Sequence, residues 1–366
     1  MSERSPIVHV VGARPNFMKA GPVVKALTAR GVPQQLVHTG QHYDRTLSDV
    51  FFEELGLPQP DRNLEVGSGS QARQTAALLT ALEDTLPALE PAIVVVYGDV
   101  NSTLATALVT SKQGLRLAHV EAGLRSFDRT MPEEVNRVVT DALSDLLFVT
   151  SPEAIDNLKR EGADESAIHF VGNPMIDTLL ANLDRLDAAA ARRAHDLPER
   201  YAVATLHRPA NVDSDEAAGA LVEMLRGVAS RLPVVLPLHP RGRETLARAG
   251  LLEIPGLRVV EPLGYVAFLS LVRGATLVIT DSGGIQEETT ILGVPCLTVR
   301  PNTERPITIS HGTNRLLRPE AVVGTVDEIL GQPSSGAAAP TAPPLWDGHA
   351  GGRIADVLVA EAGRSA

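Results

Sequence analysis

The sequence predicts an α/β protein with two doubly wound, Rossmann-like domains, and three observations lead to this prediction. Short runs of β-branched residues alternate with longer segments of helical period along most of the 366 residues. The runs are apolar throughout, as in parallel strands that helices cover on both faces. The alternation occurs in two successive series, and a chain of this length is typical of two domains of roughly 100–200 residues each.

The elements follow in order along the chain. The first series of predicted strands comprises residues 7–12, 35–38, 93–97, 116–120 and 146–150, and the second comprises 169–171, 201–205, 234–238, 257–260, 277–280 and 295–299. Helical periodicity predicts helices over 20–30, 70–86, 133–143, 215–230 and 285–292. Because Gly172 and Pro174 punctuate the chain, we expect an N-terminal domain over 1–171 and a C-terminal domain over 172–351. A C-terminal helix over 352–366 is expected to join the first domain.

Composition and charge exclude several classes of protein. Lys and Arg number 33 against 44 Asp and Glu, so the net charge is −11, and aromatic residues make up 3% of the chain. Such a chain lacks the basic stripe and the stacking platforms of a protein that binds bulk nucleic acid. Cys296 is the only cysteine, so neither an intrachain disulfide nor a Cys-rich metal site can form, which fits a cytoplasmic compartment. No signal peptide and no membrane span are expected, because no apolar run approaches the ~20 residues of a membrane helix.

Polar residues after the strands of the first series are candidates for a site, because ligands bind beyond the carboxyl ends of strands in open α/β sheets. Arg14 and Lys19 accompany a helix N-terminus that suits a phosphate, although an ordinary turn with solvated side chains fits equally well. Asp99 is either a site carboxylate or a helix cap. Glu121 ends a strand, where an unpaired carboxylate is unfavourable, and an ion pair with Arg125 is the structural alternative.

Three further positions follow the same logic. Glu133 begins a predicted helix, and its spacing from Thr130 matches a capping box, so a catalytic role and a capping role are equally open. His207 and His239 each follow a strand of the second series and are each accompanied by an arginine. Two such groups in equivalent positions of successive βα units indicate an anion site better than one histidine does.

The strongest local signal is the run DSGGIQEE at residues 281–288. Ser282 is the expected helix cap, and Gly283 and Gly284 let backbone N–H groups approach a diphosphate closely. Glu288, about one helical turn further on, can reach a ribose diol, and Arg305 adds positive charge near the same edge. A glycine-rich turn without a ligand is the alternative. The chain has no GxGxxG fingerprint, no P-loop, no HExxH zinc motif and no GxSxG elbow.

An ordered set of motifs resembles the non-hydrolysing UDP-N-acetylglucosamine 2-epimerase family. The motifs are GARPNFMKAGPVVKAL, TGQHYD, YGDVNST, HVEAGLRS, MPEEVNR, GNPMIDTL, TLHRPANVD, TDSGGIQEE and TERP, from about residue 12 to residue 305. The resemblance implies a GT-B-like fold with a UDP-sugar in the interdomain cleft, a homodimer, and no metal or nicotinamide cofactor. It also implies interconversion of UDP-GlcNAc and UDP-ManNAc by elimination of UDP to 2-acetamidoglucal and re-addition.

The resemblance also assigns roles to matching positions. It implies that Asp99, Glu121 and Glu133 are the catalytic carboxylates and that His207 supports the departing diphosphate. The implied diphosphate contacts are Arg14, Ser282, Gly283, Gly284 and Arg305. Glu288 resembles the ribose contact and Phe268 part of the uracil pocket, whereas Lys19 and His239 match important positions with less defined roles.

One stretch departs from part of the family. Relatives that bind a second UDP-GlcNAc as an activator have a glutamine-rich stretch after the second strand, and here residues 38–44 read HTGQHYD. This sequence is similar to the subgroup that contains archaeal enzymes and epimerases of 3-modified UDP-sugars, which argues against such activation. A 2-epimerase of a 2,3-diacetamido UDP-sugar and a hydrolysing 2-epimerase therefore remain alternatives. A GT-B glycosyltransferase is a further alternative, but three carboxylates favour epimerisation.

Overall fold

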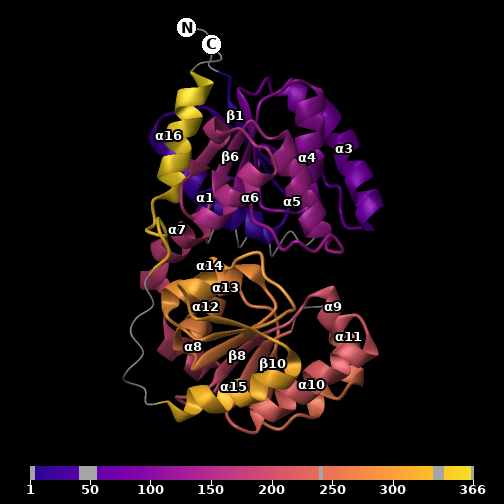
Figure 1. Cartoon of the computed structure of the whole chain (residues 1–366), viewed down its shortest axis with the longest axis vertical. Helices are drawn as coiled ribbons and strands as arrows, with labels where there is room; N and C mark the ends of the chain where they lie inside the picture. Colours follow the sequence, from indigo (N-terminus) through magenta and orange to yellow (C-terminus); the bar gives the residue numbers. More distant parts are fainter. Residues whose placement is uncertain (1–4, 41–55, 239–241, 333–341, 364–366) are drawn as a thin grey trace. The chain divides into compact units, whose positions relative to one another are not determined.

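The chain divides into two compact units, each built around its own parallel sheet (Figure 1). The computed structural model describes residues 5–40, 56–238, 242–332 and 342–363. Unit 1 comprises Met1–Ala181 and Pro344–Ala366, and unit 2 comprises Asn182–Pro343. The sequence placed the boundaries near 171 and 351. The difference at the first boundary arises because α7 (Pro174–Ala181) packs against α1 (Arg14–Ala29) and so belongs to unit 1.

Unit 1 contains a seven-stranded parallel sheet in the order β3-β2-β1-β4-β5-β6-β7. Its strands are β1 (Ile7–Val11), β2 (Gln34–His38), β3 (Arg62–Asn63), β4 (Ile93–Tyr97), β5 (Leu117–Ala122), β6 (Leu146–Val149) and β7 (Ile168–Phe170). All five predicted strands of the first series are confirmed. The strand predicted over 169–171 is β7, which pairs with β6 at the edge of this sheet. The strand β3 was not predicted, because its two residues are exposed.

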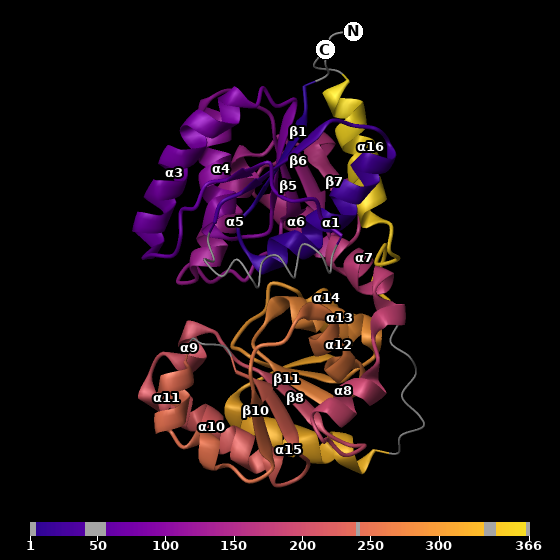
Figure 2. The same ribbon diagram turned by 180° about the vertical axis from the view of Figure 1, so that it is seen from behind.

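Two groups of helices cover the sheet of unit 1. The helices α3 (Gln71–Ala88), α4 (Asn101–Lys112) and α5 (Pro132–Leu143) pack side by side. The helices α1, α7 and α16 (Ala350–Ala362) form the second group, on the opposite side of the sheet in Figures 1 and 2. The helix α6 (Pro152–Arg160) connects β6 to β7. Because helices cover both faces, every residue of β1 and β4 is buried, which explains why these strands are apolar apart from His9.

Unit 2 contains a six-stranded parallel sheet in the order β10-β9-β8-β11-β12-β13. Its strands are β8 (Ala202–Thr205), β9 (Val234–Pro237), β10 (Leu257–Val260), β11 (Leu277–Thr280), β12 (Cys296–Val299) and β13 (Asn314–Leu317). Its helices are α8 (Ala188–Ala194), α9 (Pro209–Val212), α10 (Asp215–Ala229), α11 (Arg243–Arg248), α12 (Tyr265–Gly274), α13 (Gly283–Leu292), α14 (Ile307–Ser310) and α15 (Pro319–Gly331). Both units therefore have the predicted doubly wound, Rossmann-like architecture. Each sheet reverses its strand order once, between β1 and β4 and between β8 and β11.

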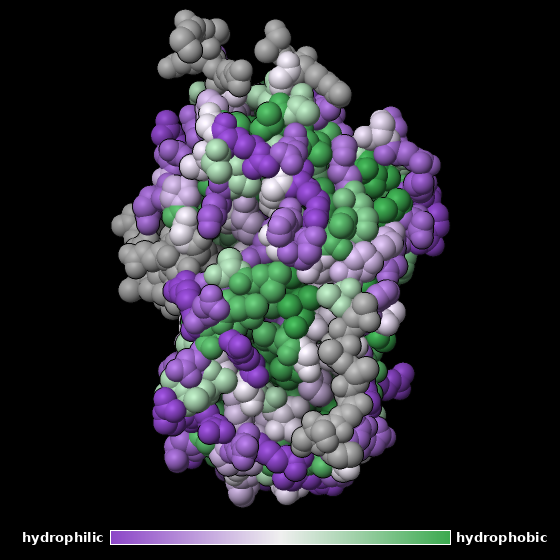
Figure 3. Space-filling view, turned by 90° about the vertical axis from the view of Figure 1, so that its left-hand side faces the viewer, coloured by the Kyte–Doolittle hydropathy of each residue, from purple (hydrophilic) through white to green (hydrophobic). Residues whose placement is uncertain are grey.

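Figure 3 shows that hydrophilic side chains cover much of the face that it presents, with apolar side chains gathered in patches between them. The large apolar side chains that are exposed include Phe127, Val135, Leu252, Ile309 and Val359. Within the described ranges, no helix combines the length and the apolar character needed to cross a membrane.

The C-terminal helix α16 is tied to unit 1 by its first turn, as the sequence predicted in outline. The carboxylate of Asp177 on α7 accepts hydrogen bonds from the backbone N–H groups of Ala350 (3.1 Å) and Gly351 (2.7 Å). Just before the helix, the indole of Trp346 donates to the carbonyl oxygen of Thr150 (2.9 Å). A carboxylate from another helix thus satisfies the free N–H groups with which α16 begins.

The Asp177→Ala variant is expected to lower the free energy of unfolding by about 2–4 kcal/mol, because two buried N–H groups lose their acceptor. The measurement is urea unfolding of the full chain. Asp156→Ala, at an exposed position on α6, is the matched control and should change stability by less than about 0.5 kcal/mol. Equal stability of the two variants would mean that α16 docks without this contact.

Candidate active site

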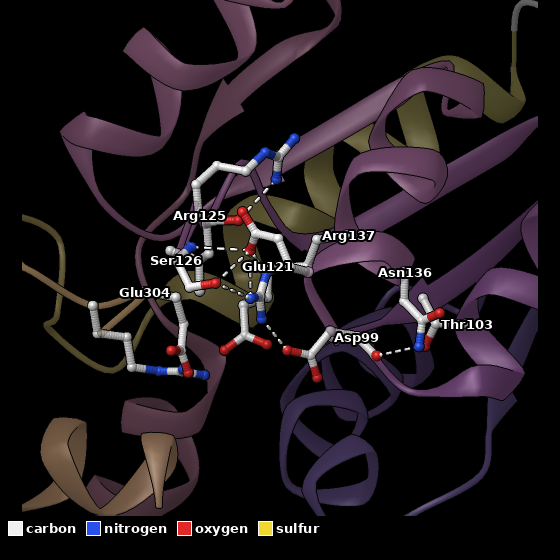
Figure 4. A network of polar contacts seen from close by, with 12 residues as sticks. Asp99, Thr103, Glu121, Arg125, Ser126, Asn136, Arg137 and Glu304 are labelled. Carbon is white, nitrogen blue, oxygen red and sulfur yellow. Dashed lines mark hydrogen bonds and ion pairs between the residues drawn. The ribbon is translucent and has the colours of Figure 1, made fainter. Parts of the chain in front are cut away.

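The carboxyl edge of the unit 1 sheet carries two ion pairs beside the reversal of strand order. Glu121 lies in β5 and pairs with Lys19 of α1, and Asp99 follows β4 and pairs with Arg137 of α5. Figure 4 shows Asp99 and Arg137 pointing toward one another, with Glu121 nearby. The structure therefore brings together three of the predicted site residues, namely Lys19, Asp99 and Glu121, around the ends of neighbouring strands.

Glu121 has an unusual backbone. Its φ of +77° lies in the left-handed region, and the register of β5 against β6 shifts between Val120 and Ala122, which marks a β-bulge. For a residue other than glycine this conformation costs on the order of 1–3 kcal/mol, and such strain clusters at functional sites. The side chain is buried and pairs with Lys19, which is also buried. The bulge therefore aims a carboxylate that an ordinary strand would not place there.

Gly98 makes room for this pair. Its φ is +64°, and a Cβ at this position would lie 2.8 Å from the Lys19 Nζ and 3.2 Å from the Glu121 Oε2. The ion pair between Glu121 and Arg125, which was the structural alternative, does not form. Arg125 instead binds Asp141 and Glu161, and Glu121 binds Lys19 of α1.

Asp99 is a partly exposed carboxylate and not a helix cap. The cap position of α4 is Val100, so the capping alternative for Asp99 is wrong. The buried guanidinium of Arg137 binds both Asp99 and the Oε2 of Glu134 (2.6 Å), and Asn136 donates to the Asp99 carbonyl oxygen (2.8 Å). The helix α5 thus holds the side chain and the backbone of Asp99 together (Figure 4).

Glu133 and Glu134 have different environments at the start of α5. The cap position of this helix is Met131, and Thr130 instead donates to the Asp128 carboxylate (2.6 Å), so the capping alternative for Glu133 does not hold. Glu133 remains a half-buried carboxylate in the first turn. Burial opposes ionisation of Glu134, but the Ser126 N–H and the Arg137 guanidinium outweigh it and lower the pKa of that carboxyl.

In unit 2, an aspartate orients His207 beside the reversal of strand order. Asp281 follows β11 and is fully buried. It accepts hydrogen bonds from the backbone N–H groups of His207 (3.0 Å) and Arg208 (2.9 Å), from the Asn211 amide (3.0 Å), and lies 3.0 Å from the His207 Nδ1. Burial opposes its ionisation, but the His207 contacts outweigh it, so the pKa of Asp281 is lowered. The His207 ring is thereby fixed while 41% of its side chain stays exposed.

A buried cluster of charges fixes Arg305 at the start of α13. Its guanidinium binds Glu287 (2.8 Å) and Glu304, and Glu304 also binds Arg300 (2.6 Å). The absence of a Cβ at Gly283 matters here, because that atom would collide with the Arg305 guanidinium. Gly283 therefore allows the arginine to reach the helix N-terminus, where an anion is favoured. Ser282 occupies the cap position as predicted, but its side chain makes no capping hydrogen bond.

The remaining predicted positions are more scattered. Arg14 is the first residue of α1 and is half-buried, and Phe268 is half-buried on α12. Gly284 lies in the first turn of α13. Glu288 is buried further along α13. His239 lies outside the described residues, as do residues 41–44 of the HTGQHYD stretch. In the described part of the chain, no group of three or more His, Cys, Asp or Glu side chains is placed to hold a metal ion.

Glu288 should make the stability of unit 2 depend on pH. Burial, with Glu287 beside it, raises the pKa of Glu288 to about 8. An unfolded glutamate titrates near pH 4.3, so between about 4.3 and 8 the folded state keeps a proton that the unfolded state releases, and stability falls as the pH rises. The Glu288→Gln variant has no such proton. Its stability relative to the parent chain is therefore expected to increase by about 3 kcal/mol between pH 5 and pH 8.

Urea unfolding at the two pH values measures this change. Glu216→Gln is the matched control, because Glu216 is an exposed glutamate on α10. It should show no pH-dependent gain. A constant difference between Glu288→Gln and the parent chain would contradict the raised pKa.

Comparison with known proteins identifies the family. A sequence model described as "UDP-N-acetylglucosamine 2-epimerase" matches residues 25–359. The chain belongs to the UDP-N-acetylglucosamine 2-epimerase family. The members of this family are isomerases, and the resemblance seen in the motifs is confirmed.

Individual family members agree over nearly the whole length. The UDP-N-acetylglucosamine 2-epimerase of Methanocaldococcus jannaschii is 40% identical over 361 residues, which cover 95% of this chain and 97% of the relative. Its crystal structure in complex with UDP-GlcNAc and UDP has a TM-score of 0.90, at 39% identity, and the match covers 97% of this chain and 99% of that one. The UDP-2,3-diacetamido-2,3-dideoxy-D-glucuronate 2-epimerase of Pseudomonas aeruginosa is 42% identical over 316 residues, covering 85% and 88% of the two chains. The GT-B-like fold is confirmed by these neighbours.

Sequence reasoning missed several residues that organise this epimerase-family chain. Arg137, Glu134, Asp281 and Glu304 all lie within the motifs but were not assigned a role. A usable signal existed for Asp281, because it directly follows the parallel strand β11, which is buried throughout, and a carboxylate there needs partners. For Arg137 no such signal existed, since its partner Asp99 lies 38 residues away in the sequence.

Proposed function

We propose that this enzyme interconverts UDP-GlcNAc and UDP-ManNAc without hydrolysing them. The observation that carries the proposal is the pair of carboxylates at the ends of β4 and β5, with Glu121 held in a strained left-handed bulge. Glu133, in the first turn of α5, supplies a third carboxylate, and α5 is the helix that follows β5 in the chain. The M. jannaschii relative, 40% identical, bears this activity in its name.

The reaction needs a base, an acid and a stabilised leaving group. In the forward step the C2–H bond breaks and its proton passes to a carboxylate. The electron pair forms the C1–C2 double bond of 2-acetamidoglucal, and the C1–O bond breaks with its pair on the diphosphate oxygen. Re-addition returns a proton to the opposite face of C2. Because the two faces need separate groups, we assign this proton transfer to Asp99, Glu121 and Glu133.

The basic residues hold the leaving group. We assign the diphosphate to Arg14, Arg305 and the N-terminus of α13 at Ser282, Gly283 and Gly284. His207, oriented by Asp281, stabilises the charge that develops on the departing oxygen. Glu288 is assigned to the ribose and Phe268 to the uracil. Lys19 and His239 are assigned to substrate binding without a more specific role.

Proton NMR in deuterated water tests the proposal. Incubation with UDP-GlcNAc should replace the C2 hydrogen by deuterium while a UDP-ManNAc signal grows. Release of free ManNAc and UDP would instead identify a hydrolysing 2-epimerase. No reaction unless an acceptor is added would identify a glycosyltransferase.

A second candidate substrate is a UDP-sugar modified at C3. The observation that favours it is the 42% identity to the P. aeruginosa enzyme that is named for a 2,3-diacetamido sugar. The same NMR assay, run side by side with UDP-GlcNAc and with UDP-2,3-diacetamido-2,3-dideoxy-D-glucuronate, decides between them by kcat/KM.

The working state of the enzyme is also part of the proposal. We infer a cytoplasmic homodimer that needs neither metal nor nicotinamide and does not bind nucleic acid. Light scattering after size-exclusion chromatography measures the oligomeric state. Full activity after treatment with EDTA and removal of small molecules is the expected result, and dependence on an added metal would contradict it.

A further inference from the structure

A buried chain of charges lies behind the two strand ends that carry Asp99 and Glu121. It consists of Arg125, Asp141 and His119, and each is at most 5% exposed. The Asp141 Oδ2 binds the Arg125 guanidinium at 2.7 Å, and the Asp141 Oδ1 lies 2.6 Å from the His119 Nδ1. None of these residues was assigned a role in the reaction.

The ring of His119 lies between two hydrogen-bonding partners. Its Nδ1 faces the Asp141 carboxylate, and its Nε2 lies 2.8 Å from the backbone carbonyl oxygen of Gly98. Burial opposes ionisation of Asp141, but His119 and Arg125 outweigh it and lower the pKa of that carboxyl. Asp141 is therefore a carboxylate, and both partners of the ring only accept hydrogen bonds. The His119 ring therefore bridges the Asp141 carboxylate and the Gly98 carbonyl.

Two members of this chain of charges, His119 and Asp141, hold the backbone beside Asp99 and Glu121. Gly98, whose carbonyl accepts from His119, directly precedes Asp99. On the other side, the Asp141 Oδ2 accepts from the N–H of Gly123 (3.0 Å), two residues after Glu121. The Gly123 carbonyl oxygen accepts in turn from the Asn157 amide (2.9 Å). The peptide groups after the bulge are thus fixed from both sides.

A strained backbone persists only where its surroundings hold it in place. The left-handed conformation of Glu121 would relax toward an ordinary strand if Gly123 were released. The position of its carboxylate relative to Asp99 would then change. A misplacement of about 1 Å costs on the order of 10²-fold in rate. A buried cluster of charged groups also adds little to the free energy of unfolding, since apolar residues of similar size often stabilise a fold equally well.

We propose that His119 and Asp141 are positioning residues that set the spacing between the Asp99 and Glu121 carboxylates. The inference rests on the proposed function, because it takes those two carboxylates as the groups that transfer the proton. His119 links the end of β4 to β5 through Gly98, and Asp141 links β5 to α5 through Gly123. The helix α5 also carries Arg137, which binds Asp99, so one helix holds both carboxylates in place.

Two substitutions of His119 separate the link to Gly98 from the link to Asp141. In His119→Gln the amide nitrogen occupies the place of Nε2 and still donates to the Gly98 carbonyl. In His119→Asn the amide nitrogen occupies the place of Nδ1, so the link to Asp141 remains and the link to Gly98 is lost. The two variants both replace the ring by an amide and differ in which contact they keep.

The expected result is a selective loss of kcat. His119→Asn should lower kcat by about 10²-fold with KM and UDP affinity within about threefold of the parent enzyme, whereas His119→Gln should keep most of the rate. The melting temperatures of the two variants should agree. Equal kcat values, or a loss carried by KM, would overturn the positioning role.

The activity of the parent enzyme makes the failures distinguishable. Parent enzyme that epimerises neither UDP-sugar would overturn the proposed function and, with it, the role assigned to the spacing. Active parent enzyme with an unaffected His119→Asn variant would overturn the inference alone.

Discussion

The Glu121→Gln variant is expected to lose about 10³-fold in kcat while its affinity for UDP changes by less than about threefold. Glutamine has nearly the same shape, so it can occupy the same bulge, but its amide cannot accept and return a proton. Asp99→Asn should behave in the same way. The retained affinity follows from assigning most UDP contacts to unit 2, whereas Glu121 belongs to unit 1.

The Glu121→Gly variant separates the carboxylate from the strain. Glycine adopts a φ of +77° without penalty. The free energy of unfolding of Glu121→Gly should therefore be about 1 kcal/mol larger than that of Glu121→Gln. Both leave Lys19 without its carboxylate partner, which makes them a matched pair. Both should exchange the C2 hydrogen about 10³-fold more slowly than the parent enzyme. Exchange at nearly the parent rate in either variant, or loss of UDP binding with the fold intact, would contradict the role given to Glu121.

The strands were the easiest part of the fold to predict, and the physical reason is their burial on both faces. Runs such as β1 and β4 are buried at every position and almost entirely apolar, with His9 as the polar exception in β1. The sequence did not predict a range for the helix α4, because its residues show no clear apolar and polar faces. It is buried around much of its circumference and carries small residues, so its sequence shows little contrast between faces. The strand β13 was not predicted, because it begins with the polar residue Asn314 and the exposed Arg315.

The candidate site was predictable in its residue types and not in its pairings. Motifs at strand ends identified Asp99, Glu121 and His207, since that edge is where a parallel sheet binds ligands. Their partners are far away in sequence, as with His207 and Asp281, which are 74 residues apart. Local rules failed where they competed with these long-range contacts. Glu121 and Arg125 are close in sequence, but the left-handed bulge and the carboxylate of Asp141 direct them to different partners.

The Asp281→Ala variant is expected to lower both stability and turnover. Four donor groups, from His207, Arg208 and Asn211, lose a fully buried acceptor, so the free energy of unfolding should fall by about 3–5 kcal/mol. Turnover should fall by about 10²-fold even at temperatures where the variant is folded, because the His207 ring is no longer held toward the leaving group. Asp215→Ala, at an exposed aspartate of α10, is the control and should cost no more than about 1 kcal/mol.

The Asp281→Asn variant separates the charge of this residue from its hydrogen bonds. The amide keeps one oxygen for the backbone N–H groups of residues 207 and 208, so it should unfold less readily than Asp281→Ala. Because the pKa of Asp281 is lowered on folding, the stabilisation by its charge exists above the unfolded pKa of about 3.9 and disappears as the pH falls through the folded value. The difference in unfolding free energy between the parent enzyme and Asp281→Asn should therefore shrink as the pH falls below about 4. A difference that stays constant down to pH 3 would mean that the hydrogen bonds, and not the charge, hold His207 in place.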